Sequence, residues 1–221
     1  MNKKSKNAFL TTVIVCVVVL GVLFLLQKGL FLRKTVETPP NQLMTYVNET
    51  YGFSISYPKN LIPETTFQKY PSLGDTWMAG ASEESKGKAL LCVPIFRVTN
   101  ESSYPRDWNT EVRIGITTDP IELQSFLTKN SYTETPPKEE IINGITFYVF
   151  PIQDAGMMKF LSGFSYRTIH DGVGYAIERI KTGSIYRDSN NSSKDIPDST
   201  LDPYFNQTSK IVKSFQFIGK Q

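Results

Sequence analysis

An uncharged apolar run near the start of the chain constrains its fold more than any other feature. Residues 8–26 contain no charge, and only Thr11, Thr12 and Gly21 dilute the apolar side chains. At about 1.5 Å per residue, a helix of this length matches the ~30 Å hydrocarbon core of a bilayer. A helix is also suited to lipid because it satisfies its own backbone hydrogen bonds. The run therefore predicts one transmembrane helix with its ends at Ala8 and Leu26.

Two other interpretations of this run are disfavoured. A cleaved signal peptide has a short apolar region and a small-x-small cleavage site, whereas this run is long and ends in Leu25-Leu26-Gln27-Lys28. A lipoprotein would use Cys16, but Val15 precedes it and apolar sequence continues after it. Cys16 is more simply an apolar helix residue. We therefore expect an uncleaved signal-anchor.

The net charge of +3 is unevenly distributed. Up to Gln42 there are six basic residues and one acidic residue, which gives +5, and the remaining 18 basic and 20 acidic residues give −2. Basic residues flank the apolar run, and the compact cluster before it favours a cytoplasmic N-terminus. In the later part of the chain bases are scattered among acids, which argues against nucleic-acid binding.

These observations predict four segments. Residues 1–7 form a cytoplasmic tail, 8–27 a membrane span, 28–42 a linker with two adjacent prolines, and 43–221 an extracytoplasmic domain. The expected location is the cell membrane, crossed once, with the lipid bilayer as the first partner.

Strand patterns dominate the domain. Residues 51–57 alternate aromatic or aliphatic with small residues, and Pro58 ends the pattern. Residues 89–98 form a dense apolar strand in which Pro94 predicts a sheet edge or a bulge. A third alternating strand covers residues 111–117.

Turn and cap signals complete the fold prediction. Asn143-Gly144 and Asp171-Gly172 each separate two strand patterns, and both dipeptides tolerate the positive φ of tight hairpins. Asp119-Pro120 and Asp202-Pro203 each predict a helix start. Strands outnumber helices and hairpins imply antiparallel pairing. The expected class is therefore α+β, with a central antiparallel sheet and helices on its faces.

Two end motifs resemble a known family. The segment Tyr51-Gly52-Phe53 that leads to Tyr57-Pro58 resembles the opening strand of PsbP-like domains, and Ser214-Phe215-Gln216-Phe217 is similar to their closing strand. Residues 144–150 and 166–172 look like the extracytoplasmic PsbP-like proteins of bacteria. The resemblance implies an α/β/α sandwich and brings no catalytic residues. Members of the family differ in role, so the fold does not fix the function.

Residues that could carry chemistry each have a simpler explanation. His170 beside Asp171 lies at a predicted hairpin turn, where adjacent side chains point apart, so a catalytic pair is not expected. Cys92 lies within an apolar strand pattern, which favours a buried, inert thiol. Asp195, Asp198 and Asp202 lack the alternating acids and the glycine of a calcium loop. We expect no catalytic residue, no metal site and no cofactor.

Trp77 and Trp108 remain as interaction-face candidates, with core packing as the simpler alternative. The sequence then favours a membrane-tethered, non-enzymatic extracytoplasmic module for binding or assembly, with an unidentified envelope protein as a possible partner. The alternative is an extracytoplasmic hydrolase, or an enzyme acting on a small ligand, with a site built from dispersed residues.

Overall fold

The structure, a computed structural model, describes residues 42–65, 77–82, 84–100, 106–132, 134–156, 158–184 and 198–219. The expected tail, membrane span and linker up to residue 41 lie outside these ranges. Within them, none of the helices combines the length and apolarity needed to cross a bilayer. The chain from Gln42 to Gln221 forms one compact unit, which is described by itself below.

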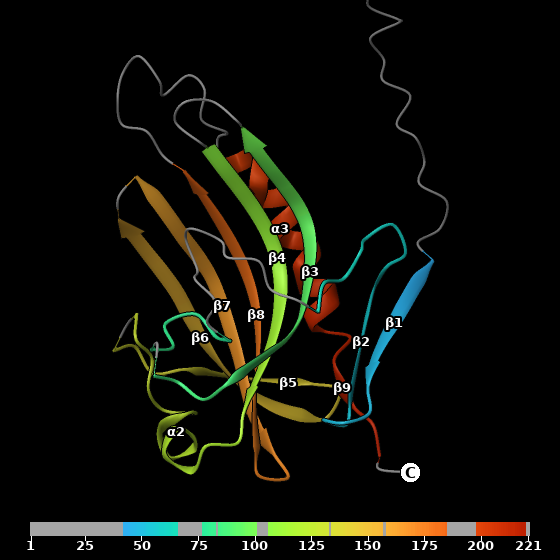
Figure 1. The fold of residues 1–221 in the computed structure, drawn as a ribbon, viewed down its shortest axis with the longest axis vertical. Helices are drawn as coiled ribbons and strands as arrows, with labels where there is room; N and C mark the ends of the chain where they lie inside the picture. The colour runs from blue at the N-terminus through green and yellow to red at the C-terminus, as the bar shows by residue number, and fades with distance from the viewer. Residues whose placement is uncertain are drawn as a thin grey trace, which may run out of the picture. The chain divides into compact units, whose positions relative to one another are not determined.

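The described chain is an α+β domain with two antiparallel sheets (Figure 1). The small sheet has the order β1-β2-β9, with β1 at Leu43–Asn48, β2 at Phe53–Pro58 and β9 at Gln216–Phe217. The large sheet has the order β3-β4-β8-β7-β6-β5. Its strands are β3 (Lys88–Asn100), β4 (Arg106–Thr117), β5 (Lys138–Ile142), β6 (Ile145–Gly156), β7 (Lys159–His170) and β8 (Val173–Ser184). The helices are α2 (Pro120–Ser125) and α3 (Asp198–Val212). The strands thus divide into two sheets, where the sequence predicted one central sheet.

Both predicted hairpins are confirmed. Asn143 and Gly144 have φ of 50° and 80°, and Asp171 and Gly172 have φ of 50° and 74°. These turns connect β5 to β6 and β7 to β8 with direct pairing on both sides. The prediction for Pro94 is also confirmed, because β3 is an edge strand and its register shifts between Pro94 and Phe96.

One helix start is confirmed and the other is wrong. Asp119 caps α2, since its carboxylate accepts hydrogen bonds from the backbone N–H of Ile121 at 2.8 Å and of Glu122 at 3.2 Å. By contrast, α3 begins at Asp198, so Pro203 lies inside the helix. Pro203 and Ser199 are both exposed, so water can satisfy the carbonyl that the proline leaves without a donor.

The two faces of the large sheet differ in chemistry. On one face, here called the α3 face, Val112, Ile114 and Ile177 pack in the main apolar core. Ile211 and Val212 of α3 and Phe53 and Ile55 of β2 join the same core, as does Phe215 beyond the helix. Figure 1 shows α3 running along β3, β4 and β8.

The opposite face, here called the α2 face, carries polar residues within its core. Strand register places Arg113 of β4, Glu178 of β8 and Ser165 of β7 in one row across the sheet. Cys92 and Phe150 extend the row at either end. Apolar residues flank it, with Trp77, Phe126 and Ala176 in one cluster and Ala79, Ile152, Leu161 and Ile180 in another. The α2 face therefore contains the main concentration of buried charge described next.

Candidate ligand pocket

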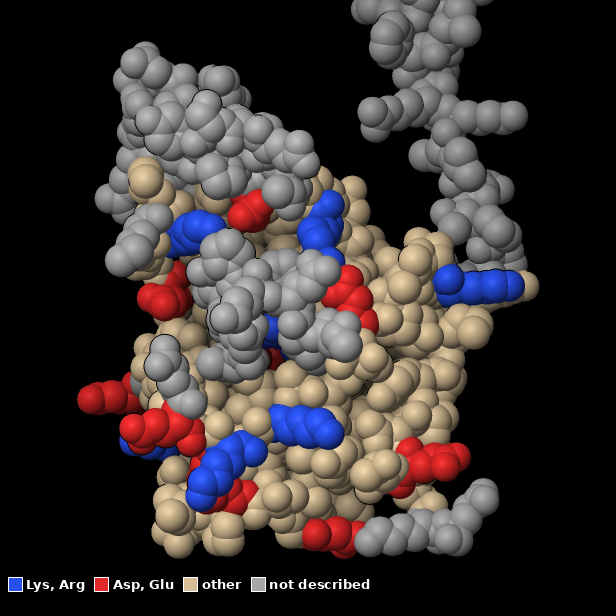
Figure 2. All heavy atoms as spheres, in the orientation of Figure 1, with Lys and Arg blue, Asp and Glu red and all other residues tan. Residues whose placement is uncertain are grey.

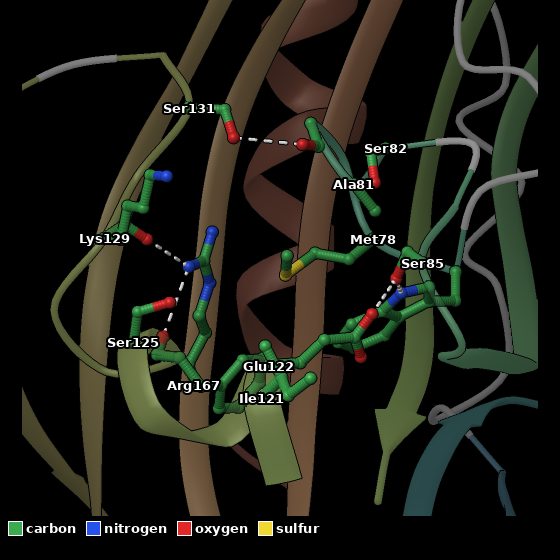
Figure 3. A pocket seen from close by; sticks show the side chains of 13 residues that line it. Met78, Ala81, Ser82, Ser85, Ile121, Glu122, Ser125, Lys129, Ser131 and Arg167 are labelled. Atoms are coloured by element: carbon green, nitrogen blue, oxygen red, sulfur yellow. Dashed lines mark hydrogen bonds between the residues drawn. The ribbon is translucent and has the colours of Figure 1, made fainter. Parts of the chain in front are cut away.

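A pocket of about 330 Å³ opens on the α2 face (Figure 3). Three parts of the chain enclose it, namely the segment from Trp77 to Ser85, helix α2 with the loop after it, and Arg167 of β7. Its lining residues are Trp77, Met78, Gly80, Ala81, Ser82, Ser85, Ile121, Glu122, Ser125, Phe126, Lys129, Ser131 and Arg167. The lining thus combines apolar walls, four serine hydroxyls and three charged side chains.

Trp77 forms a rigid wall of this pocket. Its ring stacks on Phe126 with centroids 5.9 Å apart and an interplanar angle of 24°. Two glycines make room for it, because a Cβ at Gly87 would lie 2.0 Å from the indole and a Cβ at Gly115 would lie 2.2 Å from the Trp77 carbonyl oxygen. Neither glycine has a positive φ, so close approach is what requires them.

The acidic end of the pocket is saturated by hydrogen bonds. Glu122 Oε1 accepts from Ser85 Oγ at 2.5 Å and from the Lys86 backbone N–H at 2.9 Å. Thr117 Oγ1 donates to the other oxygen, Oε2. Trp77 Nε1 donates to Ser85 Oγ at 2.5 Å, which leaves the serine hydroxyl proton for Glu122. This carboxylate therefore fixes the loop before β3 against α2.

Backbone carbonyls, a hydroxyl and aromatic rings hold the cationic end of the pocket. Arg167 is 3% exposed, and its Nη1 donates to the carbonyls of Lys129 at 2.7 Å and Phe126 at 3.3 Å. Nε donates to Ser165 Oγ at 3.2 Å, and the guanidinium lies 4.2 Å from the centre of the Phe150 ring. Burial lowers the pKa of Arg167 to about 10, so the group stays protonated at neutral pH.

Three more buried charges lie beside Arg167 on the α2 face. Glu178 Oε2 accepts from the Ala79 backbone N–H at 2.9 Å, and burial raises the pKa of this carboxyl. Arg113 Nε lies 3.0 Å from Glu111 Oε1, and both side chains are at most 1% exposed. Buried ionisable groups with shifted pKa beside a cavity are typical of functional sites, although structural ion pairs also produce them.

The two tryptophans named from the sequence do not form an exposed aromatic face. Trp77 is 5% exposed and Trp108 is 2% exposed, so core packing describes both. This corrects the interaction-face expectation. Trp77 nevertheless lines the pocket, whereas Trp108 does not.

The other residues weighed from the sequence lie apart from the pocket lining. His170 stacks on Phe217 with centroids 3.9 Å apart, and its Nε2 is 3.7 Å from Asp171 Oδ2. Cys92 donates its thiol to Glu111 Oε2 at 3.3 Å, and burial raises its pKa well above the ordinary value. Cys92 is 1% exposed, so its predicted burial is confirmed, and such a thiol stays protonated.

The acidic residues considered for calcium take other roles. Asp202 accepts from Lys181 Nζ at 3.1 Å, Asp198 begins α3, and Asp195 lies outside the described residues. Among the residues that the structure describes, no group of three or more His, Cys, Asp or Glu could hold a metal ion.

Sequence reasoning missed Arg167 and Glu122, the two charges that define the pocket. The signal nearest to this face was in β4, where Glu111 and Arg113 alternate with Val112 and Ile114. The same alternation describes a strand with one face in water, so the pattern alone does not reveal burial on both faces.

No protein-family model matches the chain, and a search of curated proteins finds no match either. The function is therefore argued from the geometry of the pocket.

Proposed function

We propose that the protein is a membrane-tethered, non-enzymatic extracytoplasmic binding module whose binding element is the pocket on the α2 face. The apolar run at residues 8–26 supports the tether, with the N-terminus in the cytoplasm. The pocket volume of about 330 Å³ lies within the ~300–1,000 Å³ typical of small-molecule sites. A partner protein of the envelope remains a second class of ligand for the same module.

One observation carries this proposal. Glu122 is committed to three donors, while the guanidinium of Arg167 is anchored through Nε and Nη1, and its Nη2 has no hydrogen bond with the described residues. A pocket with a fixed, partly uncommitted cation is suited to holding a polar ligand. Its described lining contains no histidine, the residue that most often acts as a general acid or base.

The surface charge agrees with a small-ligand role over a nucleic-acid role. Figure 2 shows Lys and Arg interspersed with Asp and Glu on the face in view, without a continuous basic stripe among the coloured residues. Nucleic-acid binding depends on such a stripe or patch.

We also propose that the domain has the PsbP-like α/β/α arrangement. Supporting this, α3 packs on one face of the large sheet, and Phe126 at the end of α2 packs on the other. The two end motifs meet, because Ser214 Oγ accepts from the Ser56 backbone N–H at 2.8 Å and donates to its carbonyl at 3.0 Å. Their aromatic residues Phe53 and Phe215 stack with centroids 5.5 Å apart. A high-resolution experimental structure with one helix layer missing would overturn this arrangement.

Cell fractionation tests the tether. Membranes are washed with carbonate, and the chain is then sized by intact-mass measurement. We expect the full-length chain to stay in the membrane pellet. Recovery of a shortened, soluble chain that starts after residue 26 would overturn the tether and favour a cleaved signal peptide.

One observation favours an enzyme as second candidate. Ser85 Oγ lies 2.5 Å from Glu122 Oε1 inside the pocket, as a serine nucleophile would lie beside a carboxylate base. Treatment with an alkyl fluorophosphonate tests it by mass spectrometry. A single adduct that disappears in Ser85→Ala would establish a reactive serine and replace the binding proposal. An unmodified Ser85 would support the binding module.

A further inference from the structure

We infer that the pocket binds a small organic carboxylate, with its anionic group at Arg167 and Lys129 and its apolar body against Trp77 and Phe126. This inference rests on the proposed function, since it names the ligand class for the same pocket. Four properties carry it, namely unused donors, a buried cation without a direct ion-pair partner among the described residues, the number of donors, and the size and lining of the pocket.

The unused donors lie at the cationic end. Arg167 Nη1 and Nε are engaged, but Nη2 has no hydrogen bond or ion pair with any described residue. The ammonium of Lys129 likewise has no such partner in the described chain. In the view of Figure 3 the guanidinium of Arg167 lies between Lys129 and Met78, below Ser131. A ligand that accepts hydrogen bonds can therefore join two cations without displacing a protein contact.

Arg167 forms no direct ion pair with the described carboxylates. Arg167 is buried, yet none of the described carboxylates lies within 4.0 Å of it. Buried charges in proteins are normally paired, because leaving the water costs several kcal/mol per ion. Glu178 interacts with Arg167 electrostatically without contacting it, and burial raises the pKa of this carboxyl. A ligand carboxylate placed at Nη2 would supply the missing partner.

The donor count favours a monocarboxylate over a phosphate. A carboxylate has two oxygens, which match one guanidinium nitrogen and one ammonium. A phosphate offers three or more acceptor oxygens and a larger charge, and such groups are usually met by clusters of cations or by backbone N–H groups. Here the third charged lining residue is Glu122, which would repel a dianion.

The remaining walls select an apolar body of modest size. Aromatic and aliphatic surface comes from Trp77, Met78, Ile121 and Phe126. The rings of Trp77 and Phe126 stack on each other. A volume of about 330 Å³ equals that of roughly ten liquid waters, at about 30 Å³ each. A chain of five or six carbons with one carboxylate fits this space with room for water.

The test uses the full-length chain in lipid nanodiscs and the fluorescence of Trp77. The sequence contains two tryptophans, so Trp108→Phe makes Trp77 the sole reporter. Trp108 Nε1 has no hydrogen-bond partner among the described residues, so this replacement removes no hydrogen bond. Hexanoate, hexanamide, hexylamine and inorganic phosphate are each titrated separately into the protein. Each titration runs to ~10 mM, because millimolar affinity is ordinary for ligands of this size.

We expect saturable binding of hexanoate and at least tenfold weaker binding of hexanamide, because the charged hydrogen bonds are lost. Arg167→Gln should weaken hexanoate about tenfold or more, and Lys129→Gln about threefold. Lys129 is exposed, so its replacement leaves folding intact even if Arg167→Gln does not fold. Lys213→Gln, an exposed lysine just after α3, is the matched control and should bind hexanoate as before.

The outcomes separate the two proposals. If hexanamide or hexylamine binds as tightly as hexanoate, the carboxylate inference is overturned and small-ligand binding stands. If phosphate binds more tightly than hexanoate, the ligand class is a phosphate and the inference is likewise overturned. If none of the four compounds changes Trp77 fluorescence, the carboxylate inference fails and the proposed small-molecule function of the pocket fails with it.

Discussion

The two faces of the large sheet are built from the same strands but bury different chemistry. On the α3 face, Val112, Ile114 and Ile177 meet Phe215 in an apolar core. On the α2 face the neighbouring positions of those strands are Arg113 and Glu178, both at most 1% exposed. Apolar burial stabilises a fold directly, whereas buried ion pairs contribute little net stability. The difference indicates that the α3 face holds the domain together and the α2 face is available for a site.

The largest expected effect is on the α3 face. Phe215→Ala should lower the free energy of unfolding by about 4 kcal/mol, because it removes a fully buried ring that contacts Phe53, Phe147 and Tyr175. Urea unfolding of the full-length chain measures this. Ile141→Ala, at a side chain that is 74% exposed, is the control and should change stability by less than ~0.5 kcal/mol. If Phe215→Ala lowered the free energy of unfolding by less than Ile141→Ala, the α3 face would not be the part that stabilises the domain.

Removal of one buried charge should have the next largest effect. Arg113→Met should cost about 3 kcal/mol, because it leaves the carboxylates of Glu111 and Glu178 without this cation. The double variant Arg113→Met with Glu111→Leu should be more stable than the single variant, since both members of the 3.0 Å pair are then apolar. Equal losses in the two variants would mean that the pair itself contributes strongly to stability.

The pH dependence of stability tests the cost of burying Glu178. Burial raises the folded-state pKa of this carboxyl, so the protonated form is favoured in the folded state. Its contribution is therefore fully present below the ordinary value of 4.5 and is lost as pH rises through the folded-state pKa. Glu178→Gln should be more stable relative to the wild-type chain at pH 7 than at pH 4. Unfolding curves at both pH values measure the difference, and a constant difference would contradict the assignment.

Removal of an ion pair at the rim of the α3 face should have the smallest effect on stability. Lys181 Nζ lies 3.1 Å from Asp202 Oδ1, and the aspartate side chain is 55% exposed. Exposed ion pairs of this kind contribute up to about 1 kcal/mol. A double-mutant cycle with Lys181→Met and Asp202→Ala should give a coupling energy below ~1 kcal/mol, which salt reduces further. A coupling energy of about 3 kcal/mol, as large as the loss of stability expected for Arg113→Met, would remove the distinction between buried and exposed charge.

The sequence predicted the fold better than the site, for physical reasons. Asn143-Gly144, Asp171-Gly172 and Asp119-Pro120 act through their own backbone preferences, and each is confirmed as a turn or a cap. Asp202-Pro203 follows the same rule but lies within α3, because the fully buried Leu201 packs from the turn before the proline. Local signals therefore succeed unless tertiary packing overrides them.

The pocket depends on tertiary contacts that no local pattern encodes. Arg167 reaches carbonyls about forty positions earlier in the chain, at Phe126 and Lys129, and Glu122 reaches back to Ser85. The sequence pattern of a strand that carries Arg167 or Glu178 is the same whether the polar side of the strand meets water or is covered by a loop. The burial of the two tryptophans also depends on such contacts, since Trp77 packs over Gly115 and Trp108 packs beside Gly183.

The pairing of β2 with β9 sets the order in which this domain can be completed. β2 pairs with β9, and Ser56 is bonded to Ser214 across 158 positions. The aromatic core that includes Phe53 thus lacks Phe215 until almost the whole domain has been synthesised. Contacts this distant in sequence close late in folding and slowly. A nascent chain stopped before Phe215 would have every strand of the large sheet but an open core beside β2.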